Sequence, residues 1–494
     1  PELSQTDGAP DGRWVFINAN NTPRIARIDL TTFSTTEIIE IPNSAGNHAS
    51  SFVTPNTEYV SAATRFSVPM DENLQNQDVS IDSYADTFKG TLSFVRADTP
   101  GEMRIASQNL VPGFHYDLSH AGKGPSDGWA FFTSYNSEEA HTLLEVNASK
   151  NAQHLTPAVN WKTPPEYGEQ PACSPVPGEP VHHWIDTPTH VARSETRDEV
   201  CVLDPREQTG LIYYLPTPKS PHGVDVDPSG RYIVAGGKLS TVIPVHSFEK
   251  MIAAIENERF EGEIDGIPVL EYEAILHGEV ENPGLGPLHT EFDGRGNAYT
   301  TAFISSEIVK WSLESLEVVD RIDTYYSPGH LMIPGGDSRK PWGRYLVALN
   351  KITKDRYLPT GPELAHSAQL IDISGEKMKL LLDFPTMGEP HYAQAIEASL
   401  IKDKQVRLYN IRESKHPHAA LSEDEARVER RGNEVHVYMT TIRSHFAPDN
   451  IEGIKVGDEV YFHVTNLEQD WDVPHGCALM GANNAALHIM RGEP

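Results

Sequence analysis

Five histidines stand at comparable places in a repeating pattern and could together bind metal. Three of them precede an aspartate turn by four to seven residues: His222 before Asp227, His289 before Asp293 and His330 before Asp337. His48 stands ahead of the Pro55-Asn56 turn, and His391 follows Gly388-Glu389-Pro390. Neutral imidazoles without a matching set of thiolates or carboxylates suit copper best, with zinc and nickel next. Because one zinc ion takes at most four such ligands, five indicate a copper cluster. The alternative is that each histidine hydrogen-bonds a backbone group where a sheet begins.

These histidines need elements that bring them to one place. A turn with Asp and Gly, followed by β-branched and aromatic residues, recurs from Asp11 to about residue 415, for example at 11–17, 127–132, 227–234 and 293–299. Many short strands with few helices predict an all-β domain, and radial repetition in a β-propeller protects sheet edges in a domain of this length. If the segment before each turn is the innermost strand, the five histidines converge on the central channel. One helix is expected at 247–257, capped by Ser247.

The pattern changes near residue 430. Residues 422–431 predict a short charged helix, since Ser422 and Glu425 stand at capping-box spacing. Beyond it, 435–439 and 460–464 predict strands of a small β-sandwich. We therefore expect a propeller with the cluster at 1–430 and a second domain at 431–494.

The composition excludes some partners. A formal net charge of −30 argues against nucleic acid, because phosphate backbones are bound by positive surfaces. No apolar run is long enough for a membrane span. The three cysteines, Cys173, Cys201 and Cys477, are too scattered for a disulfide framework, whereas 22 histidines favour metal.

Four segments resemble the motifs of nitrous oxide reductase, in the branch of the family distinct from the denitrifier type. They are Pro221-His222-Gly223, Gly286-Pro287-Leu288-His289-Thr290-Glu291-Phe292-Asp293-Gly294, Pro328-Gly329-His330-Leu331 and Gly388-Glu389-Pro390-His391. The resemblance implies a seven-bladed β-propeller followed by a cupredoxin-like β-sandwich, and a copper oxidoreductase of denitrification that reduces N2O to N2 and water.

The resemblance also implies the metal ligands. A four-copper, sulfide-bridged cluster would be bound by His48, His222, His289, His330 and His391, and a dinuclear copper A centre would take His475 as its first ligand. The family's copper A loop is absent from 431–494, which matches only the N-terminal part of the cupredoxin domain. A calcium site would use Tyr135, Glu138 and Ser220, because carboxylate and backbone oxygens suit a hard cation.

Two polar residues match groups near the family's cluster. Lys351 and Glu389 could share a proton and supply it to the reaction, or could pair only to hold the blade. The resemblance further implies a head-to-tail homodimer in the periplasm that receives electrons from a c-type cytochrome or a similar small donor.

Two other functions remain open on the sequence. A calcium-dependent propeller hydrolase or lactonase would need carboxylates that converge on the axis. A non-catalytic binding propeller fused to a β-sandwich would use the histidines structurally.

Overall fold

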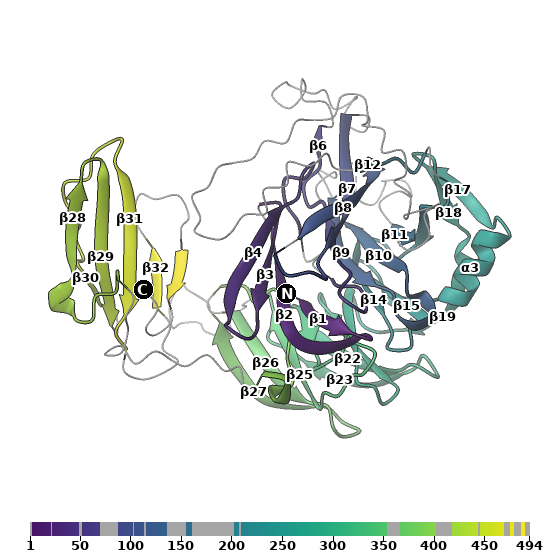
Figure 1. Cartoon of the computed structure of the whole chain (residues 1–494). Coiled ribbons are helices and arrows are strands. Elements are labelled where there is room, and N and C mark those ends of the chain that lie inside the picture. The colour runs from purple at the N-terminus through teal and green to yellow at the C-terminus, as the bar shows by residue number, and fades with distance from the viewer. Residues whose placement is uncertain are drawn as a thin grey trace. The chain divides into compact units, whose positions relative to one another are not determined.

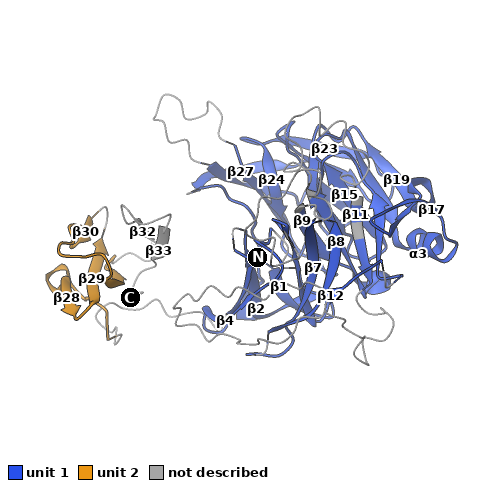
Figure 2. Cartoon of the chain, turned by 90° about the horizontal axis from the view of Figure 1, so that it is seen from above, with its two compact units in different colours: residues 1–404 blue, residues 405–494 orange. Residues whose placement is uncertain are grey.

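The structure is a computed structural model. It describes residues 2–20, 22–48, 52–69, 87–101, 103–112, 115–135, 155–160, 202–206, 209–352, 366–386, 388–401, 417–442, 445–468, 475–478 and 486–489. The chain divides into two compact units, residues 1–404 and residues 405–494 (Figure 2).

Unit 1 is built from sheets of short strands that pair mostly antiparallel, with parallel pairs only between β12 and β8 and between β13 and β18 among the described strands (Figure 1). The first two sheets, in order of pairing, are β1 (Glu2–Thr6), β2 (Ala9–Ala19), β3 (Arg24–Asp29) and β4 (Ser34–Glu40), then β12 (Val202–Leu203), β8 (Arg104–Pro112), β7 (Phe88–Arg96) and β5 (Tyr59–Ala63), with β6 (Val68–Pro69) on β7. The third sheet is β17 (Phe260–Ile264), β18 (Ile267–Leu270), β13 (Ile212–Pro216), β11 (Leu155–Asn160), β10 (Trp129–Tyr135) and β9 (His115–Ala121).

The other three sheets of unit 1 have four strands each, paired in chain order. They are β14 (Pro221–Val226), β15 (Tyr232–Gly237), β16 (Val242–Ser247) and β19 (Leu276–Glu281); β20 (Pro287–Phe292), β21 (Asn297–Ala302), β22 (Glu307–Ser312) and β23 (Val318–Asp323); and β24 (Pro328–Met332), β25 (Tyr345–Asn350), β26 (His366–Asp372) and β27 (Lys379–Thr386). The all-β propeller prediction is confirmed. The described residues form six of these sheets, so a count of seven blades stays a prediction.

The first strand of each regular sheet lies innermost, as the sequence pattern predicted. Strand β14 packs against β9 on one side and β20 on the other, and β20 packs against β24. The turn after each inner strand is fixed by its aspartate. The carboxylate of Asp227 accepts hydrogen bonds from the backbone nitrogens of Arg231 and Tyr232, both at 2.8 Å, and Asp293 accepts one from Arg295 at 2.7 Å. Such turns return the chain directly into the second strand.

Apolar residues fill the spaces between neighbouring sheets. Between the β20 and β24 sheets, for example, Tyr299, Ile308, Leu331, Leu346 and Ile371 form one buried cluster. Each fully buried aliphatic side chain of this kind stabilises the fold by about 1.5–3 kcal/mol. This packing keeps the inner strands in register with one another.

Short helices interrupt the sheets. They are η3 (Gly124–Ser126), α3 (Phe248–Glu256), α4 (Tyr272–Ile275), α5 (Ala398–Ile401) and η6 (Glu423–Glu425). The predicted helix at 247–257 is confirmed as α3, where the Ser247 side chain accepts a hydrogen bond from the backbone nitrogen of Lys250. Among the described residues, no helix is long and apolar enough to cross a membrane.

Unit 2 is also built from strands, and its beginning differs from the prediction. Its larger sheet contains β28 (Arg427–Arg431), β29 (Glu434–Ile442), β30 (His445–Ala447) and β31 (Glu459–Asn466), and β32 (His475–Ala478) pairs with β33 (Ala486–Ile489). The helix predicted at 422–431 is wrong: only the single turn η6 forms, and β28 then pairs with β29 through the turn at Gly432. Residues 427–431 form a strand because each of them pairs with a residue of β29, from Arg427 opposite Tyr438 to Arg431 opposite Glu434. The two compact units divide at 404/405, and the domain boundary expected from the sequence is at 430/431.

Candidate metal centre

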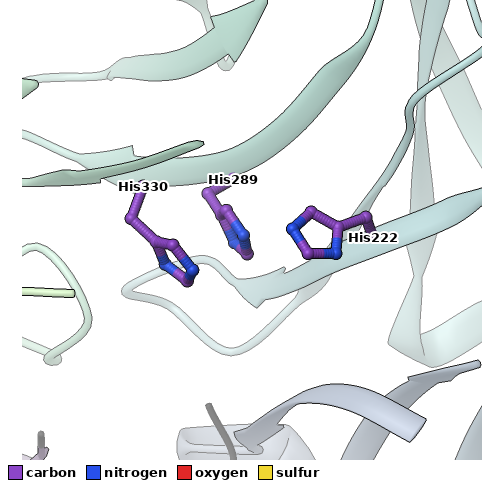
Figure 3. Close-up of side chains that lie close together, drawn as sticks. All are labelled: His222, His289 and His330. Atoms are coloured by element: carbon purple, nitrogen blue, oxygen red, sulfur yellow. The ribbon is translucent and has the colours of Figure 1, made fainter. Parts of the chain in front are cut away.

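Three of the five predicted histidines occupy equivalent places on neighbouring inner strands. His222 lies on β14, His289 on β20 and His330 on β24, and all three side chains are buried (Figure 3). One ring nitrogen from each lies within 4.8 Å of the others. Figure 3 shows the three rings directed toward a common region. The inner strands of three neighbouring sheets therefore each carry an imidazole at an equivalent position.

His48 and His391 reach the same place from irregular segments. The ring centroid of His391 lies 4.7 Å from that of His48 and 4.9 Å from that of His330. His222 and His289 are 4.9 Å apart, and His289 and His330 are 3.8 Å apart with nearly parallel planes. The structure thus brings all five predicted histidines together.

Two glycines in the recognised motifs make this close approach possible. Gly223, next to His222, has φ +92° and lies against the carbonyl of Leu288 on β20. A Cβ atom there would clash with that backbone, and an L side chain would also be strained. Gly329, next to His330, leaves room for the methylene stem of Lys351.

Hydrogen bonds between blades fix the spacing of the inner strands. The carboxylate of Asp225 on β14 accepts a hydrogen bond from the backbone nitrogen of Thr290 on β20, at 2.7 Å. Thr301 donates to the carbonyl of Gly329 at 2.9 Å, and its hydroxyl accepts from the backbone nitrogen of His289 at 3.2 Å. The histidine-bearing strands are therefore tied directly to one another.

The environment keeps the imidazoles neutral. Burial lowers the pKa of His222, His289 and His330 well below the usual value, and nearby imidazoles and lysines add to the effect. The pKa of His48 is lowered for the same reasons. Burial also lowers the pKa of His391, although its hydrogen bond to Glu389 opposes the shift. Neutral imidazole is the form that binds a metal.

Several ring nitrogens lack a protein partner. Nε2 of His289, both nitrogens of His330 and Nε2 of His391 are buried and have no hydrogen-bond partner within the described ranges. A buried polar atom without a partner is costly, and native proteins usually satisfy such atoms. Imidazoles that only hydrogen-bonded backbone groups would not show this pattern. The nitrogens are instead suited to accept a ligand that is not protein.

Asp117 was missed by sequence reasoning. It lies on β9, fully buried, with one carboxylate oxygen against Nδ1 of His48 and the other against Nδ1 of His222. A carboxylate on one ring nitrogen fixes the tautomer and directs the other nitrogen toward a metal. No local motif marks this aspartate, because it is a single acidic residue in an otherwise strand-like run.

Lys351 and Glu389 meet at His391. Nζ of Lys351 lies 2.8 Å from Oε1 of Glu389 and 2.9 Å from Nδ1 of His391, and that nitrogen lies 3.2 Å from Oε1 of Glu389. The hydrogen bond from His391, together with Lys351, lowers the pKa of Glu389 to about 2. Glu389 is therefore a carboxylate at neutral pH. Because Nδ1 of His391 faces these two groups, its Nε2 is the nitrogen left for a ligand.

A second buried polar group lies farther along the inner strands. His120, Asp225 and Asp337 place one potential ligand atom each within 4.8 Å of the others. The amine of Lys123 lies among them, 3.1 Å from Nε2 of His120 and 3.0 Å from the carbonyl oxygen of Val226. Burial lowers the pKa of Lys123. This lysine already takes the central position, so the group is a hydrogen-bonded network around an amine.

The remaining predicted site residues are only partly described. Ser220 precedes β14 with φ +58°, and its carbonyl accepts a hydrogen bond from the backbone nitrogen of Lys238. Tyr135 ends β10, and His475 begins β32, but their side chains lie outside the described part. Glu138, Cys173 and Cys201 also fall outside the described residues.

Comparisons with known proteins identify the family of the chain. The model of the nitrous oxide reductase propeller repeat matches residues 321–391, which include His330 and His391. The nitrous-oxide reductase of Stutzerimonas stutzeri is 32% identical over 96% of this chain and 71% of its own length. That of Cupriavidus necator is 34% identical over 96% of this chain and 70% of its own length. A chain of a solved mitotic checkpoint complex covers 79% of this chain at 8% identity and a TM-score of 0.42, and so weak a likeness carries no argument. These relatives, which match 96% of this chain, and the matching repeat show that this chain belongs to the nitrous-oxide reductase family.

Proposed function

We propose that the chain reduces N2O to N2 and water at a copper-sulfide cluster held by His48, His222, His289, His330 and His391. The observation that carries this proposal is the convergence of five imidazoles, four of them buried and His391 partly exposed, several of which have ring nitrogens without a partner in the described structure. The five proposed ligands are all imidazoles, a donor type that suits copper better than a hard cation. No observation favours a hydrolase or a binding propeller over this function.

The reaction takes up two electrons and two protons for each N2O. Copper bound by these imidazoles would supply the electrons and leave coordination positions for the substrate. The protein holds the ligands neutral and in place: Asp117 orients His48 and His222, and the packed inner strands exclude water from His289 and His330.

Lys351 and Glu389 would supply protons at the edge of the site. Nζ of Lys351 holds a proton 2.9 Å from the ring of His391, while the ionised Glu389 holds that amine in place. Glu389 is about half exposed, so the pair can exchange protons with solvent, whereas Lys351 is mostly buried. A positioned acid that can be reloaded from water meets the need for two protons.

Electrons would enter through copper A in the second domain, with His475 as one ligand. By likeness to the family, the donor would be a c-type cytochrome or a similar small protein in the periplasm, and copper A of one subunit would serve the cluster of its partner in a homodimer. Calcium bound by Tyr135, Glu138 and Ser220 would brace the loop that precedes His222.

The test is N2O-dependent oxidation of a reduced viologen dye by the copper-loaded, full-length protein. We expect two electrons consumed per N2O, and loss of that activity in His289→Gln. The matched control is His277→Gln, because His277 is an exposed histidine of the same unit whose ring lies beside that of Tyr232, with centroids 4.5 Å apart. Equal activity in His289→Gln and the parent would contradict the proposal.

A further inference from the structure

The segment that carries His391 has no strand to hold it. Residues 388–397 form neither helix nor strand, and the described structure contains no backbone-to-backbone hydrogen bond between 388–394 and another part of the chain. The side chain of His391 is 38% exposed, whereas that of His222, on an inner strand, is 5% exposed. The position of the His391 imidazole therefore depends on contacts made by side chains.

Two side chains that follow His391 meet at one carboxylate oxygen. Oδ2 of Asp337 accepts a hydrogen bond from the hydroxyl of Tyr392 and another from Nε2 of Gln394, both at 2.8 Å. Nε2 of Gln394 also lies 3.1 Å from the hydroxyl of Tyr392, so the three polar groups close a triangle. Asp337 thus holds the chain directly after His391.

Asp337 is itself fixed in the turn that follows β24. Its backbone carbonyl accepts a hydrogen bond from Nζ of Lys123 at 2.5 Å, and the same amine donates to the carbonyl of Val226, the last residue of β14, at 3.0 Å. Two residues farther on, the backbone nitrogen of Arg339 donates to the carbonyl of Gly8 at 2.7 Å. Because this turn is tied to three other parts of unit 1, its carboxylate can fix the position of the groups that it binds.

Tyr392 also contacts a second histidine of the cluster. Its ring lies beside that of His330, with centroids 4.8 Å apart and an angle of 66° between the planes. The ring of His391 lies 4.9 Å from the same His330 ring. Aromatic rings in edge-to-face contact keep a preferred orientation. A displacement of Tyr392 would therefore disturb two histidines at once.

The contacts on the other side of His391 act on its ring and not on its backbone. Nζ of Lys351 lies 2.9 Å from Nδ1 of His391. A lysine amine on a flexible four-carbon stem can follow the ring if the ring moves. Glu389 belongs to the same segment as His391, so it cannot fix that segment by itself. The contacts with Asp337 are the ones that fix the backbone beside the ring.

We propose that Asp337 is a positioning residue for the metal centre: through Tyr392 and Gln394 it holds His391 against His330, and it does not bind the metal itself. Outer groups usually orient a ligand through the ligand's own second ring nitrogen. Here the orienting contact passes through the neighbouring residues of the chain. The effect on copper rests on the proposed function, whereas the placement of His391 does not.

The first test measures the freedom of His391 in full-length protein prepared without copper. Diethyl pyrocarbonate reacts with neutral imidazole nitrogens, and peptide mass spectrometry gives the rate at His391 relative to the exposed His277. A ring that is held less firmly exposes its buried Nε2 more often. Tyr392→Phe removes only a hydroxyl, and we expect it to raise the rate at His391 roughly 2- to 10-fold, the effect of one lost hydrogen bond.

Two further variants and a matched control complete this series. Gln394→Leu should raise the rate at His391 by a similar factor, and Asp337→Ala, which removes the shared acceptor, should raise it more than either. The double variant of Asp337→Ala with Tyr392→Phe should match Asp337→Ala, because both changes break the same contact. The control is Tyr345→Phe, a tyrosine of the same sheet that is 49% exposed, and it should leave the rate unchanged.

The second test is copper K-edge X-ray absorption and copper affinity of the loaded full-length protein. We expect Tyr392→Phe and Asp337→Ala to show fewer imidazole neighbours per copper than the parent and an affinity lower by about tenfold or more. A role of Asp337 in stability alone would leave the number of imidazole neighbours unchanged. Circular dichroism checks folding, and if Asp337→Ala does not fold, Tyr392→Phe and Gln394→Leu decide the outcome.

The two tests separate this inference from the proposed function. If the parent binds no copper but the rates at His391 rise as expected, the proposed function fails and the placement of His391 by Asp337 stands. If the parent binds copper and the folded variants match it in both the rate at His391 and the absorption spectrum, the positioning role is overturned and the proposed function stands.

Discussion

The rings of His289 and His330 lie face to face, with centroids 3.8 Å apart and an angle of 15° between their planes. These residues come from different blades, 41 positions apart in the sequence, and both are buried and neutral. Stacking alone satisfies neither nitrogen of His330. The proposed metal centre would account for both the close approach and the missing partners.

Asp117 should control metal affinity without contacting the metal. In Asp117→Asn, the side chain can accept a hydrogen bond from only one of the two Nδ1–H groups of His48 and His222. We expect copper affinity to fall about 10- to 100-fold while the fold is retained. Competition with a copper chelator measures this loss. Asp372→Asn, a change at an exposed turn carboxylate, should leave the affinity unchanged.

Lys351 should be needed for turnover but not for copper binding. We expect Lys351→Ala to lower N2O reduction by roughly 10²–10⁴-fold, the range typical of a lost proton donor, with copper content unchanged. Lys351→Arg keeps a positive charge beside Glu389 but gives up its proton much less readily, so it should not restore the rate. Activity close to the parent's in Lys351→Ala would show that the lysine only holds the blade.

Gly329 should act through Lys351. A Cβ atom at position 329 would collide with the methylene stem of Lys351, so Gly329→Ala must displace that side chain. We expect Gly329→Ala to lower activity to nearly the same extent as Lys351→Ala. The double variant should be no worse than Lys351→Ala, because the shorter side chain removes the clash. Additive losses in this double-mutant cycle would contradict a shared cause.

Glu2 should make the propeller less stable as pH rises. Burial, with the nearby charge of Asp337, raises the pKa of Glu2 from 4.5 to about 8. Below pH 4.5 the carboxyl is protonated in both states; between pH 4.5 and 8 only the unfolded chain ionises, so the free energy of unfolding falls. In Glu2→Gln, the free energy of unfolding should no longer fall by an amount on the order of a few kcal/mol between pH 4.5 and pH 8. Urea unfolding at pH 5 and pH 8.5 measures the difference, and an equal pH dependence in both proteins would count against the buried carboxyl.

The sequence was most informative where a local pattern has one structural solution. Aspartate turns before β-branched runs predicted the inner strands, and the phase of His222, His289 and His330 then predicted their convergence. The helix predicted at 422–431 was wrong because a capping box and charged residues favour a helix locally, whereas pairing with β29 favours a strand. Propensity is a weak guide when a neighbouring strand is available.

Contacts between distant segments could not be read from the sequence. Asp117 on β9 meets His48, from an irregular segment, and His222, from the neighbouring β14, and nothing in its sequence neighbours marks it. His436 and His463 likewise come together only through the parallel pairing of β29 and β31. Spacing along the chain predicts which residues share a strand face, but not which strands lie side by side.

The most direct test of the account is copper bound per chain, together with copper K-edge X-ray absorption, in the full-length protein and in His330→Gln. We predict that the parent protein binds several coppers whose absorption shows imidazole, sulfur and copper neighbours, and that His330→Gln loses most of this copper. If His330→Gln binds as much copper as the parent with the same spectrum, then the five-histidine cluster is not the copper site and the proposed chemistry has no place to occur.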